Sequence, residues 1–156
     1  MNRTGQFFDK WADDGSAHRM ENHHLYPTLV AFDAIEWNPG WHLLDIGCGS
    51  GWASRLAAKK LHLGKVVGID VSEKMVKLAG DLSAERANIE TLHTDLPHSP
   101  FQEASFDVIH ANEAIYYIVP VSEAIKKIYK LLKPGGHFIA IIDFYVENEA
   151  SHIWAE

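Results

Sequence analysis

Short apolar runs alternate with amphipathic stretches along most of this chain. Five apolar runs predict strands at residues 41–45, 65–70, 87–93, 106–112 and 137–143. Apolar residues at helical spacing lie between several of them and predict helices at residues 52–60, 73–82 and 120–132. Because strands that alternate with helices build parallel sheets, the pattern indicates an α/β fold.

Local signals mark several of the element boundaries. Ser72 is suited to cap the start of the second of these helices. Pro120 begins the third, and the Lys-Pro-Gly-Gly sequence at residues 133–136 predicts a turn that ends it. Ahead of the first strand, residues 5–20 predict a short amphipathic helix followed by a loop, and residues 25–36 predict a second helix.

The composition is that of an ordinary globular protein. With 156 residues, 47% of them hydrophobic and 22% charged, we expect one domain over residues 1–156. The net charge of -7 disfavours nucleic acid and anionic membranes as partners. Cys48, the single cysteine, cannot form an internal disulfide, and no segment has the pattern of a signal peptide or a membrane span. We therefore expect a cytoplasmic protein.

A glycine-rich stretch after the first predicted strand carries the strongest chemical signal. Asp45 is followed by Gly47, Gly49 and Gly51 before a helix begins. Such a turn lets the backbone approach a ligand, and the first N–H groups of the helix point at it. The spacing departs from the dinucleotide fingerprint G-x-G-x-x-G because Trp52 occupies the third glycine position. We predict a cofactor cradle that suits NAD poorly.

An acidic residue about 20 positions beyond such a loop is where a ribose is held, because a carboxylate accepts hydrogen bonds from both hydroxyls. Asp70 ends the second strand at that place. Val71, the next residue, is a plausible wall for the adenine. The pattern predicts a nucleoside site without choosing the cofactor.

The pattern Asp45-x-Gly-x-Gly-x-Gly resembles the first motif of class I S-adenosylmethionine-dependent methyltransferases, of the ubiquinone- and menaquinone-biosynthesis type. The Lys-Pro-Gly-Gly turn is similar to another element of that family, so the resemblance spans residues 41–143. It implies a three-layer Rossmann-like sandwich with strand order 3-2-1-4-5, and S-adenosyl-L-methionine as cofactor. It also implies that Asp45, Gly47 and Gly49 hold the methionine end of that cofactor, and Cys48 of the same loop is expected to be cofactor-binding too.

The loop after the third strand also matches the family. In that family an aspartate in this loop forms a hydrogen bond with the adenine amino group, and the next backbone N–H contacts the adenine ring nitrogen. Asp95 and Leu96 match that pattern. The alternative is an aspartate that stabilises the turn before Pro97.

Residues after the fourth strand are expected to face both cofactor and acceptor. Asn112 is predicted to touch the methionine moiety, and Glu113, Tyr116 and Tyr117 to shape the acceptor pocket. Methyl transfer needs no protein nucleophile, because the cofactor supplies the electrophile. If the acceptor must lose a proton, Glu113, Tyr117 and His18 are the candidate general bases.

Three histidines, His18, His23 and His24, lie close together near the N-terminus. Neighbouring residues on a helix point about 100° apart, so His23 and His24 would rarely share an ion. We predict no metal site there, and a solvated or lid-lining role instead. His110 lies inside a strand and is predicted to be a core residue.

Residues 1–37 are expected to form a helical cap. In the resembling family a Phe-Asp-x-Trp-Ala segment often lies over the cofactor as a lid. The alternative is that Phe7, Phe8 and Trp11 cap the edge of the sheet.

The tail at residues 144–156 is short where the resembling family usually continues with a helix and a strand hairpin. The chain is then either a fragment or naturally short, and both cases leave the last strand as an exposed edge. We expect a homodimer or a partner chain on that edge.

These features predict a methyltransferase that transfers a methyl group to a small-molecule acceptor. One alternative is a binding module or partner subunit that holds S-adenosylmethionine or another nucleoside without catalysis. The other is an NAD-dependent oxidoreductase, against which Trp52 argues.

Overall fold

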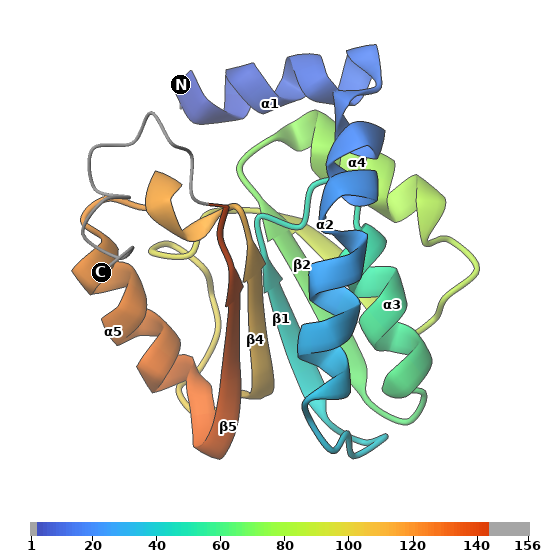
Figure 1. Cartoon of the computed structure of the whole chain (residues 1–156). Coiled ribbons are helices and arrows are strands. Elements are labelled where there is room, and N and C mark those ends of the chain that lie inside the picture. Colours follow the sequence, from blue (N-terminus) through green and yellow to red (C-terminus); the bar gives the residue numbers. More distant parts are fainter. Residues whose placement is uncertain (1–2, 144–156) are drawn as a thin grey trace, which may run out of the picture.

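A parallel sheet organises the protein, and the computed structural model describes residues 3–143 (Figure 1). Its strands are β1 (His42–Ile46), β2 (Lys65–Asp70), β3 (Ile89–His93), β4 (Phe106–Asn112) and β5 (Leu132–Ile141). The order is β3-β2-β1-β4-β5, and every neighbouring pair is parallel. This confirms the predicted fold class and strand order.

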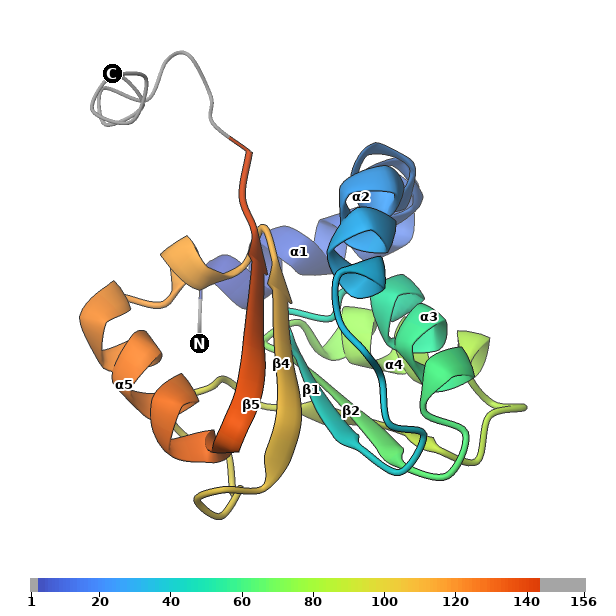
Figure 2. The same ribbon diagram turned by 60° about the horizontal axis from the view of Figure 1, so that its bottom comes forward.

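Helices cover both faces of the sheet. They are α1 (Arg3–Asp14), α2 (Ser16–Asp33), α3 (Trp52–Lys60), α4 (Glu73–Leu82) and α5 (Val121–Leu131), with a short 3₁₀ helix η1 (Ile115–Tyr117). Helix α5 lies on one face, whereas α2, α3 and α4 lie on the other (Figure 2). Helix α1 crosses above the carboxyl ends of the strands (Figure 1). Within residues 3–143, no helix combines the length and apolar character that a bilayer crossing requires.

Two apolar layers pack on either side of the sheet, because successive side chains of a strand point to opposite faces. Leu44 and Ile109 belong to the layer beneath α5. Leu43 and Val108 belong to the layer beneath α2 and α3, where Phe32 is fully buried. The core therefore rests on the central strands, which also end at the site described below.

The N-terminal helices differ from the prediction in their boundaries. Instead of a helix, a loop and a new helix from Leu25, the chain turns at Gly15, with φ of +79°, and α2 runs unbroken from there. Its buried face includes His24, Thr28 and Phe32. Since two of these residues are polar, apolar periodicity did not reveal this face.

The predicted turn at residues 133–136 is wrong, because β5 already begins at Leu132. Phe106 pairs with Leu132, and Val108 pairs with His137, so the register shifts and β5 carries extra residues there. Gly135, with φ of +77°, lies within this irregularity. Within the described residues β5 is an edge strand of the sheet, as predicted. The predicted tail at residues 144–156 lies outside them.

Phe32→Ala is expected to lower the free energy of unfolding by about 3–5 kcal/mol, because the buried ring packs against Trp37 and His110. Val30, which is 53% exposed on the same helix, provides the matched control. Val30→Ala should change that free energy by less than about 0.5 kcal/mol. Urea denaturation followed by circular dichroism measures both, and equal losses would contradict the packing of α2 on the sheet.

Candidate cofactor-binding and active site

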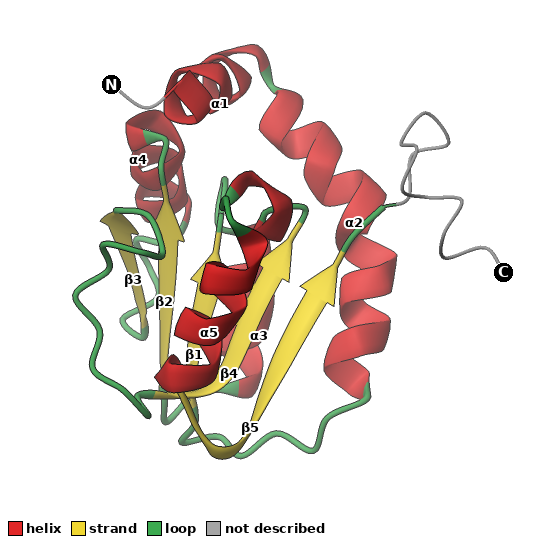
Figure 3. Ribbon diagram, turned by 90° about the vertical axis from the view of Figure 1, so that its left-hand side faces the viewer, coloured by secondary structure: helices red, strands yellow, loops and turns green. Residues whose placement is uncertain are grey.

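A cavity of about 480 Å³ opens at the carboxyl ends of the central strands. Helix α1 passes over these strand ends (Figure 3). Its lining comes from the glycine loop, the ends of β2 and β4, the loop after β3, and helices α1 and α2. This is where open α/β sheets place their ligands, and the volume lies within the usual range for small-molecule sites.

The glycine loop presents bare backbone to this cavity. Gly47 and Gly49 have φ of +66° and +53°. A Cβ on Gly47 would lie 2.5 Å from the Cβ of Ala114, whereas a Cβ on Gly49 would meet nothing within 4 Å. Gly51 caps the N-terminus of α3, and Trp52 begins that helix as a mostly buried lining residue. The loop therefore leaves room for a ligand.

Asp70 joins the glycine loop to the start of α4. Its Oδ2 accepts a hydrogen bond from the Gly49 N–H at 2.9 Å, and its Oδ1 accepts one from the Ser72 N–H at 2.9 Å. Burial raises the pKa of Asp70, against the effect of these backbone hydrogen bonds. Because each carboxylate oxygen can accept more than one hydrogen bond, Asp70 keeps capacity for a ribose diol. It lines the cavity at the predicted place.

Asp45 is more deeply buried, and both of its oxygens are engaged within the protein. Oδ1 lies 2.8 Å from Nδ1 of His110, and Oδ2 accepts a hydrogen bond from Oγ of Ser54 at 2.6 Å. These contacts join β1 to β4 and α3. His110 is fully buried, as predicted for a core residue. Direct contact between Asp45 and the cofactor remains a prediction.

Cys48 lies against β2 and is 3% exposed. A Cβ on Gly68 would lie 2.9 Å from its Sγ. Burial raises the pKa of the Cys48 thiol, and the nearby Asp70 and Asp45 carboxylates raise it further. A thiol held in its neutral form is a poor nucleophile, so Cys48 contributes packing and backbone to the cavity.

The opposite wall contains Val71, Asp95 and Leu96, all of which line the cavity. Asp95 Oδ1 accepts a hydrogen bond from the His98 N–H at 2.9 Å and lies 2.7 Å from Nδ1 of the same residue. Asp95 therefore stabilises its own turn while it faces the cavity. Its contact with adenine remains a prediction.

Asn112 ends β4 with an unsatisfied acceptor. Its Oδ1 is buried and has no hydrogen-bond partner within the part of the chain that the structure describes, and the residue lines the cavity. A buried acceptor of this kind suits a cationic donor such as an amino group. Together with the bare loop and Asp70, it provides a donor–acceptor set that fits S-adenosylmethionine.

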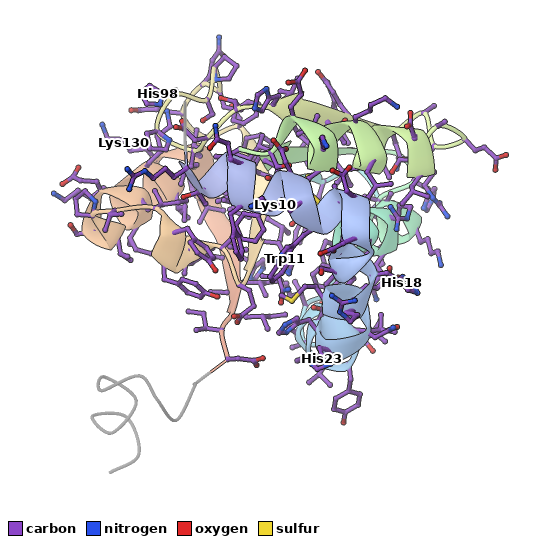
Figure 4. All side chains as sticks on the ribbon, turned by 90° about the horizontal axis from the view of Figure 1, so that it is seen from above. Lys10, Trp11, His18, His23, His98 and Lys130 are labelled. Atoms are coloured by element: carbon purple, nitrogen blue, oxygen red, sulfur yellow. The ribbon has the colours of Figure 1, made fainter. Side chains whose placement is uncertain are left out.

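Two of the three candidate bases lie in the cavity wall. Glu113 is 6% exposed, and its Oε2 accepts a hydrogen bond from the Tyr116 hydroxyl at 2.6 Å. Tyr117 is 45% exposed and packs edge-on against Phe8. His18 does not line the cavity, and Figure 4 shows it on the outer side of α2. The structure therefore does not bring His18 to the site.

Helix α1 covers the cavity and is anchored to α4. Phe8 and Trp11 both line the cavity, which supports the lid interpretation. Asp9 Oδ1 accepts hydrogen bonds from Ser72 Oγ at 2.6 Å and from the Lys74 N–H at 3.3 Å. Sequence analysis missed Asp9, whose only cue was its place in the Phe-Asp-x-Trp segment.

Further lining residues escaped the sequence analysis because no motif marks them. They include Thr4, Ala17, Met20 and Ile118.

Comparison with known proteins agrees with this geometry. Residues 44–140 match the family described as "Methyltransferase domain". Because this match covers more than half of the chain, the protein belongs to the class I S-adenosylmethionine-dependent methyltransferases. The cofactor of this family is S-adenosyl-L-methionine.

The chain is 31% identical, over 78% of its length, to "Demethylmenaquinone methyltransferase" of Staphylococcus aureus (strain MRSA252), and covers 50% of that protein. It is 32% identical, over 78% of its length, to "2-phytyl-1,4-naphtoquinone methyltransferase" of Thermosynechococcus vestitus, and covers 54% of it. The chain therefore spans about half the length of these curated relatives.

A solved complex between the Haloferax volcanii Trm112 methyltransferase activator and a methyltransferase contains a similar chain. The match has a TM-score of 0.84 and 33% identity, and covers 94% of this chain and 65% of that chain.

Gly47→Ala is expected to weaken binding of S-adenosylhomocysteine at least about tenfold, because the new methyl group meets Ala114 and the left-handed backbone disfavours a side chain. Isothermal titration calorimetry measures the affinity. Adding Ala114→Gly removes the opposing carbon and should restore part of the loss. Gly15→Ala, at an equally left-handed but open position, is the control. Normal binding by a folded Gly47→Ala variant would remove the loop from the site.

Proposed function

We propose that this chain binds S-adenosylmethionine and transfers its methyl group to a small, hydroxylated aromatic acceptor. The observation that carries the proposal is the cavity itself. One end offers bare backbone and buried acceptors, and the other offers aromatic and aliphatic side chains. The methionine end would lie on the glycine loop, the ribose on Asp70, and the adenine between Val71, Asp95 and Leu96.

The bound cofactor supplies an electrophilic methyl group, so the protein has to align the acceptor and exclude water. Phe8 and Trp11 of α1 cover the cavity from above and provide that exclusion. Glu113 and Tyr117 lie in the same wall and are the candidates to take a proton from the acceptor.

The acceptor wall favours a flat apolar molecule. Phe8, Tyr117, Ile118 and Val119 line it, and Phe8 and Tyr117 pack edge-on with ring centroids 5.4 Å apart. Aromatic rings pack well against such edges and faces. The names of the two curated relatives, both of which describe naphthoquinone-type methyltransferases, support the same acceptor class.

A partner on the edge of β5 forms a further part of the proposal. Parallel edge strands expose unpaired backbone groups that readily pair with another chain. The similar chain in the Haloferax volcanii complex is accompanied by an activator protein, which supports a partner for this chain too. Light scattering of the purified chain, alone and mixed with an activator of that type, would detect a dimer or a complex.

A cofactor titration combined with an acceptor screen tests the proposed activity. S-adenosylmethionine should bind in calorimetry and should not be displaced by NADH. Incubation with reduced naphthoquinones should then yield methylated product by mass spectrometry. Binding without turnover of any acceptor would favour the non-catalytic module, and displacement by NADH would favour the oxidoreductase.

Asp70→Ala is expected to weaken S-adenosylmethionine binding at least about tenfold, because the ribose hydroxyls lose their acceptor. Asp70→Asn preserves the shape and tests the charge alone. Asp81→Asn, an exposed residue at the end of α4, is the control. Unchanged affinity in both Asp70 variants would remove this residue from the site.

The Asp70 carboxylate predicts a pH dependence of cofactor binding. Since burial raises the pKa of Asp70 above its ordinary 3.8, the carboxylate becomes protonated at a higher pH than usual. Cofactor affinity should therefore fall as the pH decreases through this raised pKa, and Asp70→Asn should lack that step. Folding stability should change with pH in the opposite direction. Burial of Asp70 costs free energy only when the carboxylate is ionised, so its contribution to stability decreases as the pH rises.

Asp9→Ala is expected to speed dissociation of S-adenosylhomocysteine, because α1 loses its attachment to the start of α4. The free energy of unfolding should fall by about 0.5–2 kcal/mol, as for loss of a helix cap. Tryptophan fluorescence, to which Trp11 and Trp52 of the cavity lining both contribute, reports the dissociation rate in a stopped-flow experiment. Lys10→Ala, an exposed neighbour on α1, is the control (Figure 4). An unchanged rate would show that this anchor does not control exit.

A further inference from the structure

Three potential metal ligands from separate elements meet where Glu113 lines the cavity. His24 comes from α2, Glu113 follows β4, and Asp143 follows β5. One ligand atom of each residue lies within 4.8 Å of those of the other two. Helix α2 runs beside the carboxyl end of β5, which brings these residues together (Figure 3).

We propose that His24, Glu113 and Asp143 form a binding site for a divalent transition-metal ion. Neighbouring histidines on a helix rarely share an ion, and the exposed His23 takes no part in this cluster. His24, in contrast, is on the buried face of α2 and lies near carboxylates from two other elements.

The histidine is not satisfied by the protein. His24 is 2% exposed, and its Nδ1 has no hydrogen-bond partner within residues 3–143. Its Nε2 lies 3.8 Å from Oδ2 of Asp143, too far for a hydrogen bond. A buried ring nitrogen without a hydrogen-bond partner is costly, and an ion would satisfy it.

The two carboxylates also lack a cation. Within the described part of the chain, no lysine or arginine forms an ion pair with Glu113 or Asp143, and Asp143 pairs only with His24. Two carboxylates held close together repel each other unless a positive charge lies between them. A divalent ion would supply that charge.

The spacing suits shared coordination. With bonds of about 2.0–2.2 Å, ligand atoms of one ion are separated by roughly 3–4.3 Å. The separation of 3.8 Å between His24 and Asp143 falls in this range, and the limit of 4.8 Å for the whole set requires only a small adjustment.

Glu113 is held as metal ligands usually are, by hydrogen bonds from surrounding groups. Oε1 accepts a hydrogen bond from the Asp143 N–H, and Oε2 accepts one from Tyr116. Its φ of +51° is uncommon for a residue other than glycine, and such conformations cluster at functional sites.

The ligand set indicates the kind of ion and its use. One imidazole and two carboxylates suit manganese, iron or zinc better than magnesium or calcium. Asp143 is 52% exposed, which leaves an entry path and positions for water. Because Glu113 lines the cavity, the ion would also reach an acceptor oxygen there. This last use rests on the proposed function, whereas binding of the ion does not.

Titration of the full chain with Mn²⁺ alone, followed by electron paramagnetic resonance of the free ion, tests the site. We expect one ion per chain and displacement by Zn²⁺. His24→Asn and Asp143→Asn should each weaken Mn²⁺ binding at least about tenfold. His23→Asn, the exposed neighbour on the same helix, is the matched control and should bind like the unaltered chain. Absence of a stoichiometric site, or equal binding by Asp143→Asn, would overturn the proposal.

Thermal melting separates a metal site from a purely structural network. Mn²⁺ should raise the Tm of the unaltered chain and of His23→Asn, because an ion that binds only the folded state stabilises it. At the same Mn²⁺ concentration it should raise the Tm of Asp143→Asn by less, and an equal shift in this variant would count against the site. Calorimetry with S-adenosylmethionine on the same variants distinguishes failure of the metal site from failure of cofactor binding.

Discussion

A single buried carboxylate, that of Asp70, fixes the relative positions of the parts that make the site. It receives one N–H from the glycine loop and another from the start of α4. The residue that caps α4, Ser72, in turn binds Asp9 of α1. The loop, the end of β2 and the covering helix are therefore linked through adjoining contacts. A carboxylate is suited to this task because it can accept several hydrogen bonds at once.

The charge of the site explains its preference among nucleoside cofactors. Asp45 and Asp70 are both buried, and within residues 3–143 their only ion-pair partner is the ring of His110. In that same range, no lysine or arginine pairs with either. Such surroundings disfavour the pyrophosphate of a dinucleotide and favour the sulfonium and ammonium groups of S-adenosylmethionine. Both this negative charge and the position of Trp52 therefore disfavour NAD as the cofactor.

The sequence predicted the regular parts of the fold because their signals are local. Strand β2, strand β4 and the Ser72 cap follow directly from apolar runs and turn chemistry. Features that depend on contacts between residues distant along the chain could not be predicted from the sequence. The burial of His24 depends on β5 and on the segment after β4, and the register shift before His137 depends on pairing with β4. Likewise the carboxylate of Asp9 accepts its hydrogen bond from Ser72, far along the chain, so only the folded structure reveals this partner.

The close contact between α1 and the end of β2 bears on how ligands enter and leave the cavity. A Cβ on Gly5 would lie 2.5 Å from the carbonyl oxygen of Val71, so the backbone of this helix touches the end of β2 without intervening side chains. At this contact there is no passage between α1 and the end of β2. If movement of α1 limits product release, the turnover number responds to solvent viscosity more than to the reactivity of the acceptor.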